Sequence, residues 1–255
     1  MLTYAILAAV IAARQEVQSP SAAGLISNVF ARYMGAKSLE GTVTLTQTAR
    51  GLAVKTTTLL AYERPSKILL VQRQGGSSPK ASQIVSNGEK FVYTRPEQLI
   101  TQSDYLGEAV KPDDRRAAQT VGDLYAIVAS GLPDRSPLLD ILVARREDLE
   151  FVKAQFRSFS YAGRIQLGDR SVQVVRGKWQ ENNMVEAGIG DFELYITDDG
   201  DLVRYVLKQN YAVPGAVQNG RTVPTSAPIE VVSTWDASVV VNGTIKPETF
   251  ALRAH

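Results

Sequence analysis

The chain has 255 residues, with 28 Lys and Arg against 26 Asp and Glu, no cysteine, and a single histidine, His255. These counts exclude disulfides, thiolate metal sites and cysteine nucleophiles, and they make a Ser-His-Asp triad or a multi-histidine metal site nearly impossible. The near-neutral charge argues against nucleic acid as a partner, because phosphate binding needs clustered positive charge. We therefore expect a protein that is not an enzyme and that holds no cofactor and no metal.

Residues 2–13 form an uncharged apolar run, LTYAILAAVIAA. The run is too short to span a bilayer as a helix, which takes about 20 apolar residues. It fits the apolar core of a secretory signal, with small residues for cleavage at Ala13 or, further along, Ala23. The alternative is a buried N-terminal helix. With a signal of residues 1–13, or as far as 23, we expect a periplasmic or otherwise exported protein that is soluble after cleavage.

A helix and a first block of strands follow. Residues 22–37 place apolar side chains at helical spacing, and Gly35 is expected to end this helix. From Leu39 the apolar period changes to two, with threonines at the alternate positions, which is typical of strands with one wet face. Short turns, among them Arg64-Pro65-Ser66 and Asn87-Gly88, imply antiparallel pairing of neighbouring strands. The further strands expected here are 52–62, 67–74, 83–85 and 90–94.

Residues 111–153 interrupt the strand pattern. One helix is expected from Pro112-Asp113-Asp114 to Gly131, with its apolar residues on one face. A second helix is expected to begin at Ser136-Pro137, with serine as the N-cap and proline in the first helical position. This helical insert separates two blocks of strands.

The second block runs from Phe156 to the end of the chain. We interpret Asp198-Asp199-Gly200-Asp201 as a hairpin turn, because it lacks the spacing and the closing glutamate of a calcium loop. Residues 213–228, rich in proline, glycine and small polar residues, are expected to form a long mobile loop. The candidate strands of this block are 156–162, 164–167, 171–178, 191–197, 202–211, 229–241 and 248–253.

The fold class that follows is α+β. A sheet this large curls or closes, and the apolar helices need a surface to cover. We therefore expect residues 22–255 to form one domain, a strongly curved antiparallel sheet, or incomplete β-barrel, with helices covering its concave face and a helical insert at 111–153. Such an architecture encloses an apolar cavity, which suits binding.

Several segments resemble, in order, the periplasmic lipoprotein-carrier superfamily, the LolA/LolB-like proteins. Residues 39–47 are similar to its first strand, and residues 63–68 (ERPSKI) to its Arg-Pro motif. Residues 86–93 (SNGEKFVY) resemble its Ser-Asp-Gly stretch, with Asn87 where Asp is usual, and 96–102 resemble the segment that follows. Residues 192–210 and 247–252 resemble a later hairpin and the closing strand. These segments follow one another in the family's order over residues 22–253. The chain therefore resembles a divergent, uncharacterised exported member, whose insert at 103–155 and loop at 213–228 are longer than in the small carriers.

This resemblance implies a barrel whose helices form a lid over a cavity for acyl chains. By the same resemblance, Arg64 would hydrogen-bond the lid in its closed state and Ile68 would line the pocket. The plainer interpretation is a solvent-facing turn arginine at Arg64 and ordinary packing at the apolar positions. The full set of candidate cavity and lid residues is Arg64, Ile68, Leu70, Phe91, Tyr93, Leu124, Val128 and Trp179.

Two functions remain open at this point. The first is an exported carrier, or chaperone of outer-membrane biogenesis, that holds acyl chains of lipid or lipoprotein in an apolar half-barrel cavity. A membrane-bound donor or acceptor protein is a further candidate partner of such a carrier. The second is a non-catalytic envelope sensor or scaffold that uses the same fold for protein–protein interaction. A hydrolase would need a convergent acid/base pair in a cleft, and the sequence offers no recognisable catalytic context.

Overall fold

The computed structural model describes residues 20–75, 81–94, 106–108, 120–129, 132, 137–143, 150, 152–180, 189–211, 217–218, 221–222 and 227–252, so the expected signal of residues 1–13 lies outside the described residues. The helices are α2 (Ala22–Gly35), α3 (Val121–Ala129), α4 (Pro137–Val143) and the 3-10 helix η1 (Pro247–Phe250). The strands are β1 (Ser38–Ala49), β2 (Leu52–Glu63), β3 (Lys67–Gln74), β4 (Ala81–Asn87), β5 (Lys90–Thr94), β6 (Leu106–Glu108), β7 (Phe156–Leu167), β8 (Arg170–Gln180), β9 (Ile189–Ile196), β10 (Leu202–Tyr211), β11 (Val217–Gln218), β12 (Arg221–Thr222) and β13 (Ile229–Val241).

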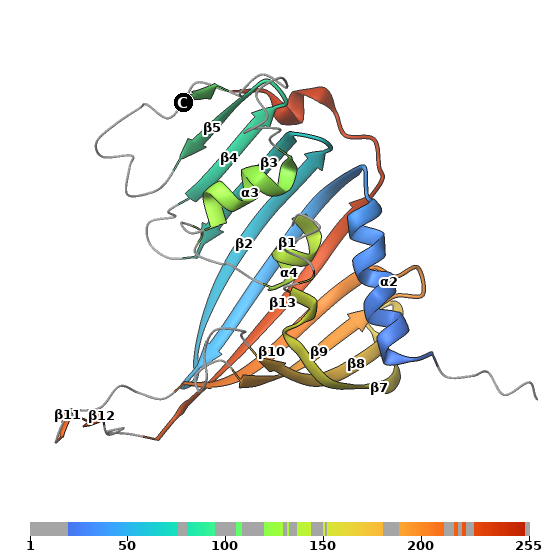
Figure 1. Ribbon diagram of the computed structural model, residues 1–255, viewed down its shortest axis with the longest axis vertical. Coiled ribbons are helices and arrows are strands. Elements are labelled where there is room, and N and C mark those ends of the chain that lie inside the picture. Colours follow the sequence, from blue (N-terminus) through green and yellow to red (C-terminus); the bar gives the residue numbers. More distant parts are fainter. Residues whose placement is uncertain are drawn as a thin grey trace, which may run out of the picture.

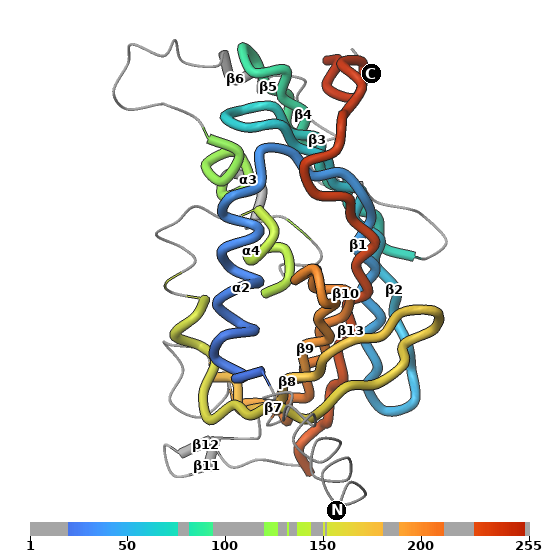
Figure 2. The backbone as a smooth tube through the Cα atoms, turned by 90° about the vertical axis from the view of Figure 1, so that its right-hand side faces the viewer, coloured from blue at the N-terminus to red at the C-terminus, as the bar shows by residue number. Residues whose placement is uncertain are grey.

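One sheet organises the described chain. Its 11 strands lie in the order β6-β5-β4-β3-β2-β1-β13-β10-β9-β8-β7, so the two end strands do not meet and the sheet stays open. β1 and β13 pair antiparallel along their length, from Leu39 opposite Val241 to Ala49 opposite Val231. This pairing joins the two strand blocks into one surface. The sheet curves around α2, α3 and α4, which lie on one side of it (Figures 1 and 2). The expected α+β incomplete barrel is confirmed.

The alternation of side chains gives the sheet two unlike faces. On β1 and β13, Val43, Leu45, Trp235 and Ala237 are buried, whereas Thr44 and Asp236, which lie between them, are half-exposed. We name the buried side, which the helices cover, the inner face and the opposite side the outer face. A single apolar core joins the inner face to all three α-helices. The period-two pattern of the sequence therefore marks the covered side of the sheet.

α2 forms as its sequence predicts. Its N-cap residue is Ser21, whose hydroxyl accepts a hydrogen bond of 3.0 Å from the Gly24 backbone N–H. The apolar stripe at helical spacing is buried, and the helix ends at Gly35. The buried residues of the stripe are Leu25, Ile26, Val29, Phe30 and Tyr33.

Four expectations about elements need correction. The strand expected at 248–253 is absent from the described part of that stretch, 248–252, because η1 occupies 247–250 and Pro247 has no backbone N–H for a sheet ladder. The two strands expected at 156–162 and 164–167 form one strand, β7, with irregular register on either side of its middle. The short strand β6 was not expected. The stretch 213–228 holds the small hairpin β11–β12 rather than loop alone.

The other elements follow the sequence closely. The helical insert supplies α3 and α4 between β6 and β7, while residues 111–119 lie outside the described residues. Among the residues described, no helix combines the length and the apolarity that a membrane crossing requires.

Neighbouring leucines on β2 provide a test of the two faces. Leu60 points to the inner face and is fully buried, whereas Leu59 points outward and is 44% exposed. We expect Leu60→Ala to lower the free energy of unfolding by about 2–5 kcal/mol, since it leaves a cavity in the core. Leu59→Ala should cost less than about 1 kcal/mol. Urea denaturation of both variants measures the difference, and equal losses would contradict the assignment of faces.

Candidate functional site

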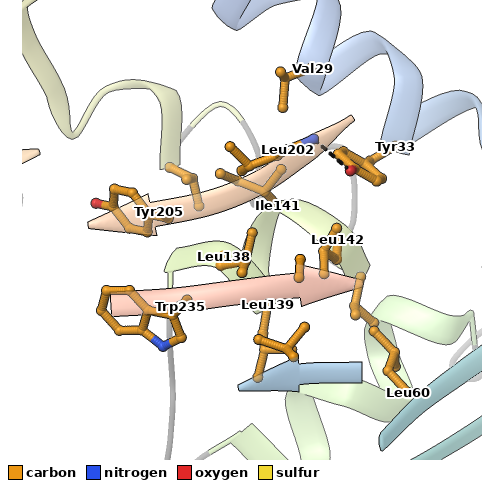
Figure 3. Close-up of a cluster of buried hydrophobic side chains, with 14 of the residues drawn as sticks. Val29, Tyr33, Leu60, Leu138, Leu139, Ile141, Leu142, Leu202, Tyr205 and Trp235 are labelled. Carbon is orange, nitrogen blue, oxygen red and sulfur yellow. Dashed lines mark hydrogen bonds between the residues drawn. The ribbon is translucent and has the colours of Figure 1, made fainter. Parts of the chain in front are cut away.

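α4 lies over the middle of the inner face (Figures 1 and 2). It has only seven residues, and five of them, Leu138, Leu139, Ile141, Leu142 and Val143, are no more than 1% exposed. Figure 3 shows four of these side chains among Val29 and Tyr33 of α2 and Leu60, Leu202, Tyr205 and Trp235 of the sheet. The centre of the inner face, where the sequence predicts a cavity, is therefore occupied by apolar side chains of the insert.

The predicted cavity residues of the first block lie in two neighbouring rows of the inner face. Ile68 stands opposite Ser86, which stands opposite Phe91, and Leu70 stands opposite Ile84, which stands opposite Tyr93. Ile68 and Leu70 are fully buried, Phe91 is 8% exposed, and Tyr93 packs against the same core. These four residues are thus brought together as part of the core wall.

The remaining predicted residues flank these rows. Leu124 of α3 is fully buried in the same core, while Val128 lies in α3 and its side chain is outside the described part of the structure. Trp179 lies on β8, in the second block, and is 6% exposed. Its indole N–H donates to the Gln155 side-chain oxygen over 3.2 Å. The described predicted residues and α4 thus belong to one core that spans both strand blocks.

The β2–β3 turn contacts two of the covering helices. The Arg64 Nε donates to the backbone carbonyl of Ala36, the C-cap of α2, over 2.9 Å, and its guanidinium lies 5.3 Å from the centre of the Tyr62 ring. Burial raises the pKa of the Tyr62 phenol, and the positive charge of Arg64 opposes that shift. The side chain of Arg64 is therefore not a simple solvent-facing one. Its role as a lid latch stays a prediction.

The same turn also fixes the start of α3. The Pro65 carbonyl accepts a hydrogen bond of 2.7 Å from the Val121 N–H. Thr120 and Asp123 exchange hydrogen bonds in the manner of a capping box, with 2.9 Å from the Thr120 N–H to the carboxylate. Sequence reasoning missed this junction, although the Thr-x-x-Asp spacing before an apolar run was a signal for it.

The β9–β10 turn holds the other side of α2. Arg32 forms an ion pair of 2.6 Å with Asp201, and the Leu202 N–H donates to the Tyr33 hydroxyl over 3.0 Å. Arg164 binds both carboxylate oxygens of Asp198 at 2.7 Å, which lowers the pKa of that carboxyl. The acidic residues are thus used in a hairpin turn, as expected, and the described residues contain no cluster suited to a metal.

Tyr205 carries a buried polar atom in the middle of the core. Its ring stacks on Trp235, with 5.2 Å between the ring centres. The residue has no exposed surface, and its hydroxyl finds no hydrogen-bond partner among the described residues. Burial raises the pKa of this phenol, so the hydroxyl stays protonated at ordinary pH. An unpaired buried hydroxyl costs free energy, and a polar group of a bound molecule could satisfy it.

Comparison with other proteins finds structural likeness but no sequence match. No family model matches the chain, and no curated protein matches it. The Pseudomonas aeruginosa MucA/MucB complex matches at 9% identity and a TM-score of 0.43, over 91% of this chain and 61% of that chain. The Mycobacterium tuberculosis lipoprotein LppX matches at 9% identity and a TM-score of 0.38, over 88% and 97%. The LolA superfamily protein NE2245 from Nitrosomonas europaea matches at 12% identity and a TM-score of 0.31, over 92% and 99%.

These likenesses are distant and concern the fold alone. The chain spans less than two thirds of the matched chain in the MucA/MucB complex. A LolA superfamily protein is among the matched structures. The sheet order and the covered inner face described above agree with the incomplete barrel that the resemblance in sequence implied.

Two buried tyrosines test the unpaired hydroxyl. Tyr205→Phe removes a hydroxyl without a described partner, so we expect the free energy of unfolding to rise by about 1 kcal/mol. Tyr33→Phe removes the acceptor of the Leu202 N–H and should lower it by about 1 kcal/mol. Thermal and urea unfolding compare the two variants. A loss of stability in Tyr205→Phe as large as that in Tyr33→Phe would mean that the Tyr205 hydroxyl has a partner.

Arg64 can be tested through the helix that it contacts. Arg64→Leu removes the charged donor to the Ala36 carbonyl, so amide hydrogen exchange in the last turn of α2 should become about tenfold faster or more. The control is Arg170→Leu, which changes an exposed arginine at the start of β8. Equal exchange in the two variants would show that Arg64 does not hold α2.

Proposed function

We propose that this protein is a non-catalytic carrier that binds acyl chains of a lipid or lipoprotein on the inner face of its open sheet. One observation supports this above all: an apolar core spans both strand blocks, and among the described residues its centre is covered by a helix of seven residues, α4, beside α2. Isolated helices of that length are not stable in water, so α4 depends on its contacts with the rest of the protein, chiefly its apolar packing. In this proposal α4 occupies the position of the acyl chain when none is bound.

Burying the side chains of α4 and burying an acyl chain on the inner face would contribute free energies of similar size. Five buried aliphatic side chains contribute roughly 7–15 kcal/mol at about 1.5–3 kcal/mol each. An acyl chain of about 12 carbons gains roughly 10 kcal/mol at about 0.8 kcal/mol per methylene, before the entropy cost of binding. Because the two terms nearly cancel, a ligand would be held with modest net affinity. Such a balance suits a carrier, which must release what it binds.

The polar atoms around the inner face fit an amphiphile rather than a pure hydrocarbon. The Tyr205 hydroxyl lies in the core without a partner among the described residues. A hydroxyl, ester or carboxyl group of a bound lipid could accept a hydrogen bond from the Tyr205 hydroxyl. The Arg64 side chain at the β2–β3 turn offers further donors at the edge of the core.

A second candidate function has its own support. The described centre of the inner face is filled by side chains of the chain itself, which is the arrangement expected of a sensor or scaffold module. In that case the fold would present its loops or outer face to a protein, and α4 would be a permanent part of the core. The position of α4 therefore separates the two functions.

The deciding experiment measures acyl binding and the effect of loosening α4. The purified protein is analysed for bound lipid by native mass spectrometry and solvent extraction, and a fluorescent fatty acid is then titrated against it. We expect Leu142→Ala, which weakens the packing of α4, to raise the affinity for the fatty acid by up to about tenfold. Leu59→Ala on the outer face is the matched control and should change nothing. No bound lipid and no titratable binding in either variant would favour the scaffold.

A further inference from the structure

The inner face continues beyond the helices toward the β1–β2 turn. One row of the sheet runs from Leu52 through Ala49, Val231, Gln209 and Gly190 to Trp179, each residue standing opposite the next. Trp179, at one end of this row, is 6% exposed, whereas Leu52, at the other end, is 74% exposed. The inner face is therefore part of the buried core at Trp179 and open surface at Leu52.

This open surface is an assembled patch rather than an isolated leucine. Val54 follows Leu52 on the inner face, 42% exposed, and Tyr211 of β10, opposite Ile229, is 40% exposed. The ends of β1, β2, β10 and β13 come together here, at the end of the sheet away from α3 (Figure 1). We name this surface the hairpin-end patch; its residues are Ala49, Leu52, Val54, Tyr211, Ile229 and Val231. Scattered apolar residues are common on protein surfaces, but a run across four adjacent strands indicates an interaction site.

The turn that carries the patch is preformed. Arg50 and Gly51 are the two residues between β1 and β2, and both have positive φ, 48° and 77°. Two-residue turns of this kind match the twist of paired strands and give a tight hairpin. Leu52 is therefore presented on a rigid element, directly after the turn.

Basic side chains surround the same end of the sheet. Arg50, Lys55 and Arg73 are exposed, and none has an ion-pair partner among the described residues. Lys55 follows the patch on β2, and Arg73 lies on the neighbouring strand opposite Thr57, so both point to the outer face. Glu230 is the one described carboxylate on these strand ends. Net positive charge among the described residues thus lies at the same end of the sheet as the patch, in the β1–β2 turn and on the outer face behind it.

We propose that the hairpin-end patch docks on the surface of an anionic lipid bilayer. Exposed apolar side chains that enter the interface, bordered by Lys and Arg that meet acidic headgroups, are the combination that binds such surfaces. A second copy of the chain is a poorer occupant, because pairing two identical patches would bring like charges together. Docking uses side chains that are exposed or half-exposed already, so it does not require α4 to move and goes beyond the carrier function proposed above.

The absence of cysteine allows a local test. Leu52→Cys and Leu59→Cys place one thiol each on the inner and outer sides of the same strand, and both are labelled with the polarity-sensitive fluorophore NBD. The full chain is mixed with vesicles of phosphatidylcholine, with and without phosphatidylglycerol. We expect a blue shift of the label at position 52 with the phosphatidylglycerol vesicles and none at position 59. The apolar run at 2–13 is common to both variants, so the difference reports the hairpin alone.

Neutralising the basic residues tests whether their positive charge contributes to docking on an anionic bilayer. Combining R50Q, K55Q and R73Q in the position-52 variant should weaken its binding to phosphatidylglycerol vesicles by about a hundredfold. The control combines K90Q and R170Q, two exposed basic residues at the starts of β5 and β8, and should bind nearly as before. Circular dichroism of each variant confirms that it is folded. The proposal would be overturned if the label at position 52 showed no blue shift, or if the label at position 59 shifted equally. It would also be overturned by a shift at position 52 that depends on protein concentration without vesicles, because the patch would then bind a second copy of the chain.

Discussion

The structure depends on covering the inner face of an open sheet. A closed barrel would hide its apolar interior by itself, but here β6 and β7 end the sheet without meeting. The pairing of β1 with β13 makes one surface out of two strand blocks, and this surface is too broad for α2 alone. α3 covers the side of β3 and β4, and α4 lies between α2 and α3. The helical insert is therefore a requirement of the sheet and not an addition to it.

The helices that cover the sheet are held by few polar contacts. One short turn, Arg64-Pro65, binds the end of α2 through its side chain and the start of α3 through its carbonyl. On the far side, Arg32 and Tyr33 bind the β9–β10 turn. α4 is linked to α3 by the Tyr125 hydroxyl, which donates to Asp140 over 2.9 Å. Beside these contacts the helices bury apolar side chains against the inner face, and such packing has no directional preference.

The inner face changes character along its length. Its centre is buried and apolar, with the Tyr205 hydroxyl as a polar atom within it. Its end at the β1–β2 turn is apolar and exposed, and basic residues stand around it. The row from Leu52 to Trp179 passes through Gln209 and Gly190 and joins the exposed end of the inner face to its buried part. The two proposals remain separable, since docking and internal binding involve different side chains.

The sequence by itself determined the elements, because their signals are local. Alternation and turn residues predict the bounds of β3, β5, β10 and β13 to the residue, and helical spacing predicts α2. The candidate pocket residues Ile68, Leu70 and Trp179 lie buried on the inner face, and their role in holding a ligand stays a prediction. Sequence reasoning could not say which distant strands pair, so the junction of β1 with β13 and the place of α4 were decided by the tertiary structure. Residues 248–253 show the same limit: Phe250 packs on the outer face beside Ala61, a contact that no local pattern encodes.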